Sequence, residues 1–176
     1  MKKVFLSSTV VISVLFGVFL FLTLTTGNSL CYTLAITFAT MCYHFIMRLT
    51  VGKFIPHSFN FKTYWFREKS FEKSLYKVLK VKKWKDKMPS YNPTSYMTRD
   101  NKIENIVNTM CRNEIIHEVN ALLSFVPILF SLAFGAIFVF VITSIIACCV
   151  DLIFVVMQRY NRPRLIRLIE RINKRN

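Results

Sequence analysis

The sequence has no Lys or Arg between Val4 and Met47, and none between Asn113 and Gln158. It is also poor in residues that interrupt helices, with only four Gly and five Pro among 176 residues. The formal net charge of +15 therefore comes from segments beside long apolar runs. This pattern favours a membrane surface over nucleic acid as the partner of the basic residues.

The five Cys residues form no C-x-x-C pair and no Cys/His cluster at zinc spacing. Four of them lie within apolar runs, where small packing residues are expected. The sequence therefore predicts no metal site built on cysteine.

Apolar runs of about 20 residues are long enough to cross a bilayer as helices. The run from Val119 to Met157 is long enough for two such spans. A turn signal at Gly27 separates the first expected span from the second, and one at Gly135 separates the third from the fourth. We expect an all-α integral membrane fold in a single domain, 1–176, with about four transmembrane helices at 4–24, 30–47, 114–132 and 136–157.

The segments between and after these spans are basic. Within the loop 48–112, residues 70–81 place apolar side chains at helical spacing with Lys on the opposite face. This segment is either an amphipathic helix on the membrane or a helix packed on the rest of the loop. The tail, 159–176, has the pattern of a second short amphipathic helix.

All 24 Lys and Arg residues lie in the N-terminus, the loop 48–112 and the tail 159–176. Four spans place these three segments on the same side of the membrane. The positive-inside tendency then predicts a multi-pass protein of the bacterial cell membrane, with a cytosolic basic loop and cytosolic N- and C-termini.

A cluster of polar residues is predicted at the cytosolic end of the last two spans. Glu114, His117 and Glu118 share one helix face, because they are spaced i, i+3 and i+4. Antiparallel pairing of the two spans brings polar residues of the second to a similar depth. The polar residues that complete this predicted pocket are Asn120, Asp151 and Gln158.

A His beside a carboxylate can act as a general base, and the carboxylate fixes its tautomer. We therefore assign His117 as the candidate base, with Glu114 or Glu118 orienting it. Glu-x-x-His is also a spacing found in di-iron bundles, but such sites need a second copy of the motif, which this sequence lacks. The prediction is a site without a metal and without a bound cofactor.

Two basic motifs are candidates for substrate binding, because Arg guanidinium groups bind phosphate or carboxylate well. The segment 82–87 places Trp84 and Lys85 among further Lys residues, which suits a membrane interface. Arg112, at the start of the third span, is a further candidate. The other motif is the heptapeptide Gln158-Arg159-Tyr160-Asn161-Arg162-Pro163-Arg164.

These motifs together resemble the glycosyl-4,4'-diaponeurosporenoate acyltransferases, small bacterial membrane proteins. The likeness runs from about residue 58 to residue 170, and the heptapeptide is its most specific part. The matching segments are Ser58-Phe59-Asn60-Phe61, Lys83-Trp84-Lys85, Arg112-x-Glu114-x-x-His117 and Gln158 to Arg164.

The resemblance implies transfer of a fatty acyl chain to a sugar hydroxyl of a glycosylated carotenoid acid, as in carotenoid biosynthesis of the staphyloxanthin type. The donor would be an acyl thioester, on coenzyme A or on an acyl carrier protein, and the acceptor would lie in the membrane. Two alternatives remain open at this point. One is another lipid-modifying transferase, such as a methyltransferase, and the other is a non-catalytic lipid-binding subunit.

Overall fold

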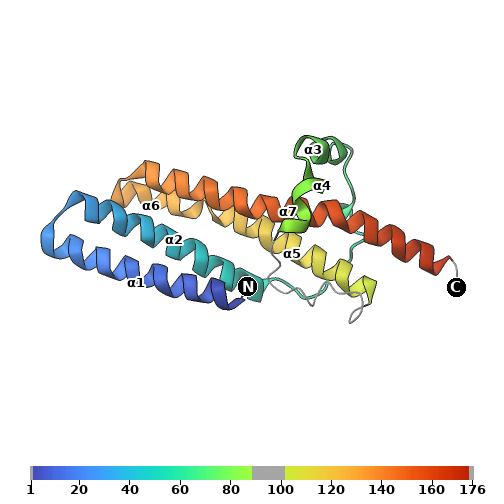
Figure 1. Ribbon diagram of the computed structural model, residues 1–176, viewed down its shortest axis with the longest axis horizontal. Coiled ribbons are helices and arrows are strands. Elements are labelled where there is room, and N and C mark those ends of the chain that lie inside the picture. Colours follow the sequence, from blue (N-terminus) through green and yellow to red (C-terminus); the bar gives the residue numbers. More distant parts are fainter. Residues whose placement is uncertain (1, 89–101, 175–176) are drawn as a thin grey trace. The chain divides into compact units, whose positions relative to one another are not determined.

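The computed structural model describes residues 2–88 and 102–174, so residues 89–101 of the predicted loop lie outside the described residues. The described residues form helices and no strand, which confirms the all-α prediction. Figure 1 shows the course of the chain. The helices are α1 (Lys2–Thr26), α2 (Ser29–Phe54), η1 (Tyr64–Phe66), α3 (Glu72–Val78), α4 (Val81–Trp84), η2 (Lys85–Lys87), α5 (Ile103–Leu123), α6 (Val126–Phe134) and α7 (Ile137–Asn173).

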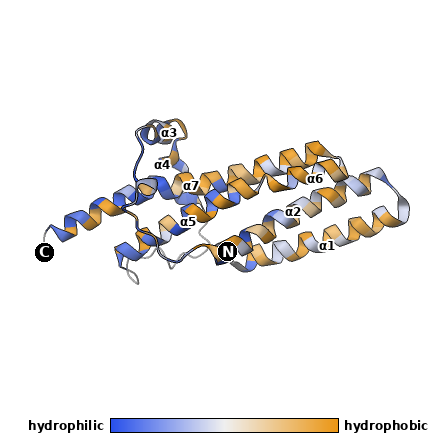
Figure 2. Cartoon of the chain, turned by 180° about the vertical axis from the view of Figure 1, so that it is seen from behind, coloured by the Kyte–Doolittle hydropathy of each residue, from blue (hydrophilic) through white to orange (hydrophobic). Residues whose placement is uncertain are grey.

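Four helical stretches are long and apolar enough to cross a membrane. Many of their large apolar side chains face outward, including Leu24, Leu132 and Phe138, and Figure 2 shows the apolar character of α1 and α6. Exposed apolar surface of this extent is expected where lipid, and not water, surrounds the helices. The chain therefore has the features of a membrane protein. The stretches are Lys3–Thr26, Ser29–Phe54, Ile103–Phe134 and Ile137–Asn173.

The chain divides into two compact units. The first contains Ile55–Glu118 and Leu152–Asn176, and the second contains Lys2–Phe54 and Val119–Asp151. The expectation of a single membrane domain stays a prediction.

In the second unit, α1 and α2 lie side by side as a hairpin (Figure 1). Gly27 makes the turn with φ of +61°, a conformation that glycine adopts without steric cost. Two tyrosine hydroxyls of α2 donate to backbone carbonyls elsewhere in this unit. Tyr43 donates to Leu123 at 3.0 Å, and Tyr32 donates to Phe134 at 2.7 Å.

Helix α2 is longer than the predicted span, which ended before Arg48. The Arg48 guanidinium donates to the Asp151 carboxylate at 2.5 Å and to the Ala147 carbonyl at 2.9 Å. The helix continues past Arg48 to Phe54, and this buried carboxylate compensates the charge of Arg48.

The predicted third span is divided into α5 and α6. Pro127 lies in the first turn of α6, where its missing N–H costs no hydrogen bond. In the interior of a continuous helix, the same residue would clash with the preceding turn. The predicted turn at Gly135 is confirmed, with φ of +66° after the last residue of α6.

Helix α7 also differs from the prediction of a span followed by a separate tail helix. It runs without interruption through Pro163 to Asn173. Proline costs a helix at least one hydrogen bond. In the first unit, Leu165, Ile166 and Ile169 on the far side of Pro163 pack against a buried core, and this packing offsets that cost.

The amphipathic segment 70–81 forms a shorter helix than predicted. Helix α3 ends at Val78, and Lys80 has left-handed backbone geometry with φ of +50° before α4 begins.

Candidate functional site

A small apolar core assembles the first unit. Phe66, Val107 and Cys111 are buried at its centre. The Asn108 side chain accepts a hydrogen bond from the Phe59 backbone N–H at 2.7 Å, which fixes the segment before η1 against α5. The partly buried residues around this core are Phe59, Phe61, Ile115, Leu165, Ile166 and Ile169.

Glu114 lies beside this core, and its side chain is fully buried. Arg159 Nη1 donates to Glu114 Oε1 at 2.7 Å, and Arg162 Nη1 donates to Glu114 Oε2. A buried carboxylate needs such partners, because the loss of its hydration is otherwise very costly. Two motifs that are distant in the sequence therefore meet at Glu114.

Arg162 is itself only 1% exposed. Its Nη2 atom donates to the Phe66 carbonyl at 2.7 Å, and its guanidinium lies 5.0 Å from the centre of the Phe66 ring. In this conformation Arg162 links α5, α7 and η1. Its predicted contact with substrate stays a prediction.

Arg159 connects the same carboxylate to η1 and to the start of α3. Its Nε donates to Glu72 Oε1 at 2.8 Å, and its Nη2 donates to the Trp65 carbonyl at 3.3 Å. Its Nη1 atom lies 3.8 Å from Glu118 Oε1. The other oxygen of Glu118 accepts from Trp65 Nε1 at 3.0 Å.

We call these side chains, Glu72, Glu114, Glu118, Arg159 and Arg162, the Glu114 network. Its three carboxylates outnumber its two guanidinium groups. The positive charges of the two arginines are therefore already compensated inside the protein. The predicted contact of Arg159 with substrate stays a prediction, as it does for Arg162.

Tyr76 extends the network on α3. Its hydroxyl donates to Glu72 Oε2 at 2.7 Å, and its ring meets the Tyr160 ring edge-on at 5.1 Å. Burial raises the pKa of Tyr76 above its usual range, and the hydrogen bond to Glu72 raises it further. Tyr76 therefore stays protonated as a donor at neutral pH.

His117 is partly buried and stacks on the Phe154 ring, with the ring centres 4.7 Å apart. It lies one helical turn after Glu114 on α5. The Glu114 and Glu118 carboxylates bond to arginine and tryptophan, as described above. Their predicted role in orienting His117 stays a prediction.

The other heptapeptide residues differ in exposure. Gln158 is buried, Tyr160 and Asn161 are partly buried, and Arg164 is exposed. Arg164 donates to the Tyr160 hydroxyl at 2.6 Å and lies over its ring at 4.2 Å. Arg164 is thus the most accessible arginine of the heptapeptide.

The remaining predicted site residues lie in different surroundings. Asp151 and the buried Asn120 belong to the second unit, where Asp151 pairs with Arg48. Arg112 belongs to the first unit and donates to the Pro56 carbonyl at 3.2 Å. The part of these residues in substrate binding stays a prediction.

Trp84 and Lys85 lie after α3 in the first unit. Trp84 donates from its indole N–H to the Leu79 carbonyl at 2.9 Å, and Lys85 pairs with Asp86 at 2.5 Å. Both side chains therefore have partners within their own segment.

Sequence reasoning missed Glu72 of the Glu114 network and the groups that bond to the network from outside it: Trp65, Tyr76 and the Phe66 carbonyl. One signal was present, because Glu72 is the one acidic residue in the lysine-rich segment 70–81. A backbone carbonyl carries no such signal. Among the described residues, no three His, Cys, Asp or Glu side chains are grouped to hold a metal ion, and the absence of a metal stays a prediction.

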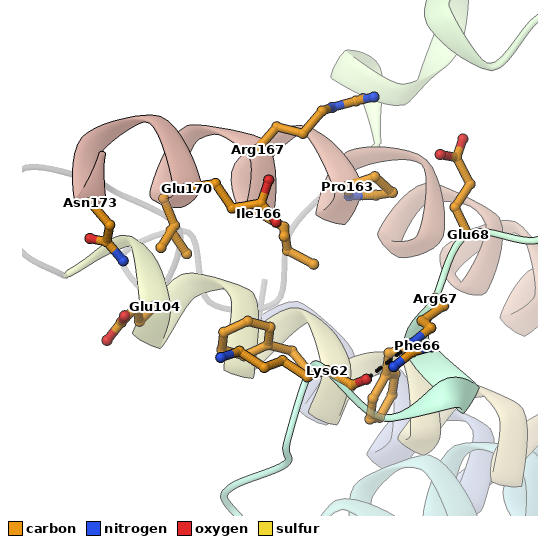
Figure 3. Close-up of a pocket in the computed structure, with 12 residues that line it drawn as sticks. Lys62, Phe66, Arg67, Glu68, Glu104, Pro163, Ile166, Arg167, Glu170 and Asn173 are labelled. Atoms are coloured by element: carbon orange, nitrogen blue, oxygen red, sulfur yellow. Dashed lines mark hydrogen bonds between the residues drawn. The ribbon is translucent and has the colours of Figure 1, made fainter. Parts of the chain in front are cut away.

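Two clefts open on the first unit. The larger, of about 570 Å³, is lined by apolar side chains that include Phe66 and Ile166 and by charged side chains that include Glu104 and Arg167 (Figure 3). The smaller, of about 450 Å³, lies beside the network. Its lining residues are Tyr64, Trp65, Lys69, Phe71 and Arg159.

The comparisons with known proteins agree with the motifs that meet at Glu114. The family model of the glycosyl-4,4'-diaponeurosporenoate acyltransferases matches residues 62–171, a range that includes the whole Glu114 network. A search of curated proteins gave no match, and neither did a search of solved structures. Because the family model matches well over half of the chain, the chain belongs to the glycosyl-4,4'-diaponeurosporenoate acyltransferase family.

Proposed function

We propose that this protein transfers a fatty acyl group from an acyl thioester to a hydroxyl of a glycosylated acceptor in the membrane, such as a glycosyl carotenoid acid. The family supports acyl transfer in carotenoid biosynthesis. The observation that carries the proposal is the meeting of the heptapeptide with the Arg112–His117 segment at Glu114. The two motifs that define the resemblance form one structure.

In the proposed reaction, the acceptor hydroxyl oxygen attacks the carbonyl carbon of the thioester. His117 takes the hydroxyl proton as the new C–O bond forms. The C–S bond then breaks, and the protonated His117 returns the proton to the leaving thiolate. The products are the acylated acceptor and a free thiol on coenzyme A or an acyl carrier protein, so the reaction balances without a further reactant.

The Glu114 network would serve this chemistry by positioning. Glu114 and Arg162 join α5 to α7, and this contact holds the α5 turn that carries His117. A preorganised base accelerates a reaction more than a mobile one, because its geometry is already correct. The proposed substrate contacts come from residues of the first unit around this frame: Arg112, Gln158, Tyr160, Asn161 and Arg164, with Trp84 and Lys85 at the interface.

The test is the His117→Gln variant. Glutamine keeps a similar size and hydrogen bonding but cannot accept a proton near neutral pH. General bases typically contribute about 10²–10⁴-fold, so we expect a loss of that size in acylated product, measured by lipid analysis in reconstituted membranes. His57→Gln is the matched control, because His57 is exposed in the same unit.

Product formation at the wild-type rate by His117→Gln would contradict the catalytic assignment. The absence of acylated product from the wild-type protein would instead favour a non-catalytic lipid-binding subunit. A methylated lipid in place of an acylated one would identify a different transferase.

A further inference from the structure

Helix α3 packs on the first unit through its polar side. Glu72 is buried and bonded to Arg159, and Tyr76, one turn later, donates to Glu72 and contacts Tyr160. Helices of soluble domains usually bury their apolar side. The orientation of α3 is the reverse of that arrangement.

The side of α3 opposite its lysines is apolar and exposed. Phe71, Leu75, Val78 and Leu79, which we call the α3 apolar face, follow helical spacing. Phe71 is 63% exposed and Val78 is 76% exposed. Leu75 and Leu79 are 37% and 43% exposed, so packing of α3 on the rest of the loop leaves much of the α3 apolar face uncovered.

The apolar surface continues beyond the helix. Phe71 also lines the smaller cleft with Tyr64 and Trp65, and all three aromatic side chains are exposed. Trp and Tyr are enriched where proteins meet the interface of a bilayer with water. This composition points to lipid as the occupant.

Lysines outnumber acidic residues around the α3 apolar face, although Glu68 is also exposed beside this helix. The two acidic residues of the segment 70–88 are each paired with a cation of the protein, Glu72 with Arg159 and Asp86 with Lys85. The other lysines of the segment are exposed, and basic clusters next to apolar side chains suit anionic lipid headgroups. The exposed lysines are Lys73, Lys77, Lys80, Lys82, Lys83 and Lys87.

We propose that the α3 apolar face, with Tyr64 and Trp65, lies in the headgroup region of the membrane that the chain spans, with the lysines against anionic lipids. An acidic carrier protein has similar charge complementarity. The membrane is favoured because four membrane-length helices hold the chain at a bilayer, so lipid is always present at high local concentration.

The experiment uses tryptophan as a depth probe in the full chain, reconstituted in lipid nanodiscs. Trp65→Phe and Trp84→Phe remove the two native tryptophans. Val78→Trp then reports on the α3 apolar face, and Lys73→Trp is the matched control on the lysine face of the same helix. Lipids brominated near the headgroup quench the emission of a tryptophan that lies among them.

We expect quenching several times stronger for Val78→Trp than for Lys73→Trp, and stronger in anionic than in neutral nanodiscs. Lys77→Glu with Lys80→Glu should remove the dependence on anionic lipid. Equal quenching of the two probes would overturn the proposal. It would also be overturned if Val78→Trp were shielded only after an acidic carrier protein is added. The readout is fluorescence and not product, so the result is independent of the proposed acyl transfer.

Discussion

The buried contact between Glu114 and Arg162 makes a strong prediction about stability. Arg162→Met removes the cation from Glu114 Oε2 and the donor from the Phe66 carbonyl. Glu114 Oε1 keeps its hydrogen bond from Arg159, but Glu114 Oε2 loses the one from Arg162. Breaking a buried ion pair from one side costs about 3–5 kcal/mol, so we expect Arg162→Met to lower the free energy of unfolding by about 3 kcal/mol.

The assay is a double-mutant cycle with Glu114→Leu. Each single variant removes one of the partners of a buried charge, whereas the double variant leaves two apolar side chains in contact. Replacing a buried pair by apolar residues is often close to neutral. We therefore expect a coupling free energy of about 2 kcal/mol or more, measured by unfolding with sodium dodecyl sulfate in mixed micelles.

Arg164→Met is the matched control, because Arg164 is an exposed arginine on the same helix. Surface substitutions usually change stability by less than about 0.5 kcal/mol. If Arg162→Met were no more destabilising than Arg164→Met, or if the cycle were additive, the structural role given to Arg162 would be refuted.

Topology, Tyr76 and Asp151 give three further tests. Topology reporters at both termini and in the loop 48–112 should report the cytosol, and reporters at Gly27 and Gly135 should report the opposite side. A reporter in the loop that reports the outer side would contradict the proposed orientation. Tyr76→Phe should cost about 1 kcal/mol of stability through the lost hydrogen bond. Because the pKa of Tyr76 is raised, this cost should be constant below about pH 10, the usual tyrosine pKa, and should shrink as pH rises above that value toward the raised folded-state pKa. Asp151→Leu should leave Arg48 without its carboxylate and lower the melting temperature in detergent, and Arg48→Met in the same chain should restore part of the loss.

The helices and their turns could be predicted from the sequence because the signals are local. Long apolar runs determine the membrane-length helices, and Gly27 and Gly135 mark turns that need positive φ. The division between α5 and α6 was missed, although Pro127 was a local signal for it. The continuation of α7 through Pro163 could not be predicted, because it depends on packing against residues far away in the sequence.

The candidate site was predictable only in part. Helical spacing correctly placed Glu114 toward α7, but it could not identify which arginines would meet it. Glu72 was missed because its partner, Arg159, lies 87 residues later in the chain. Apolar spacing identified α3 as amphipathic, yet only this long-range contact determines which of its sides packs on the protein.

The sequence separation of the Glu114 network has a consequence for biosynthesis. Glu72 and Glu114 leave the ribosome before the arginines that compensate them, since both arginines lie in α7. Until then, the carboxylate of Glu114 has to remain hydrated, and Phe66 cannot take its final place beside Arg162. The first unit can therefore close only after α7 has emerged at least as far as Arg162. Nascent chains that stop before Arg159 should expose the segment 55–88 to protease, and those that extend beyond Ile169 should protect it.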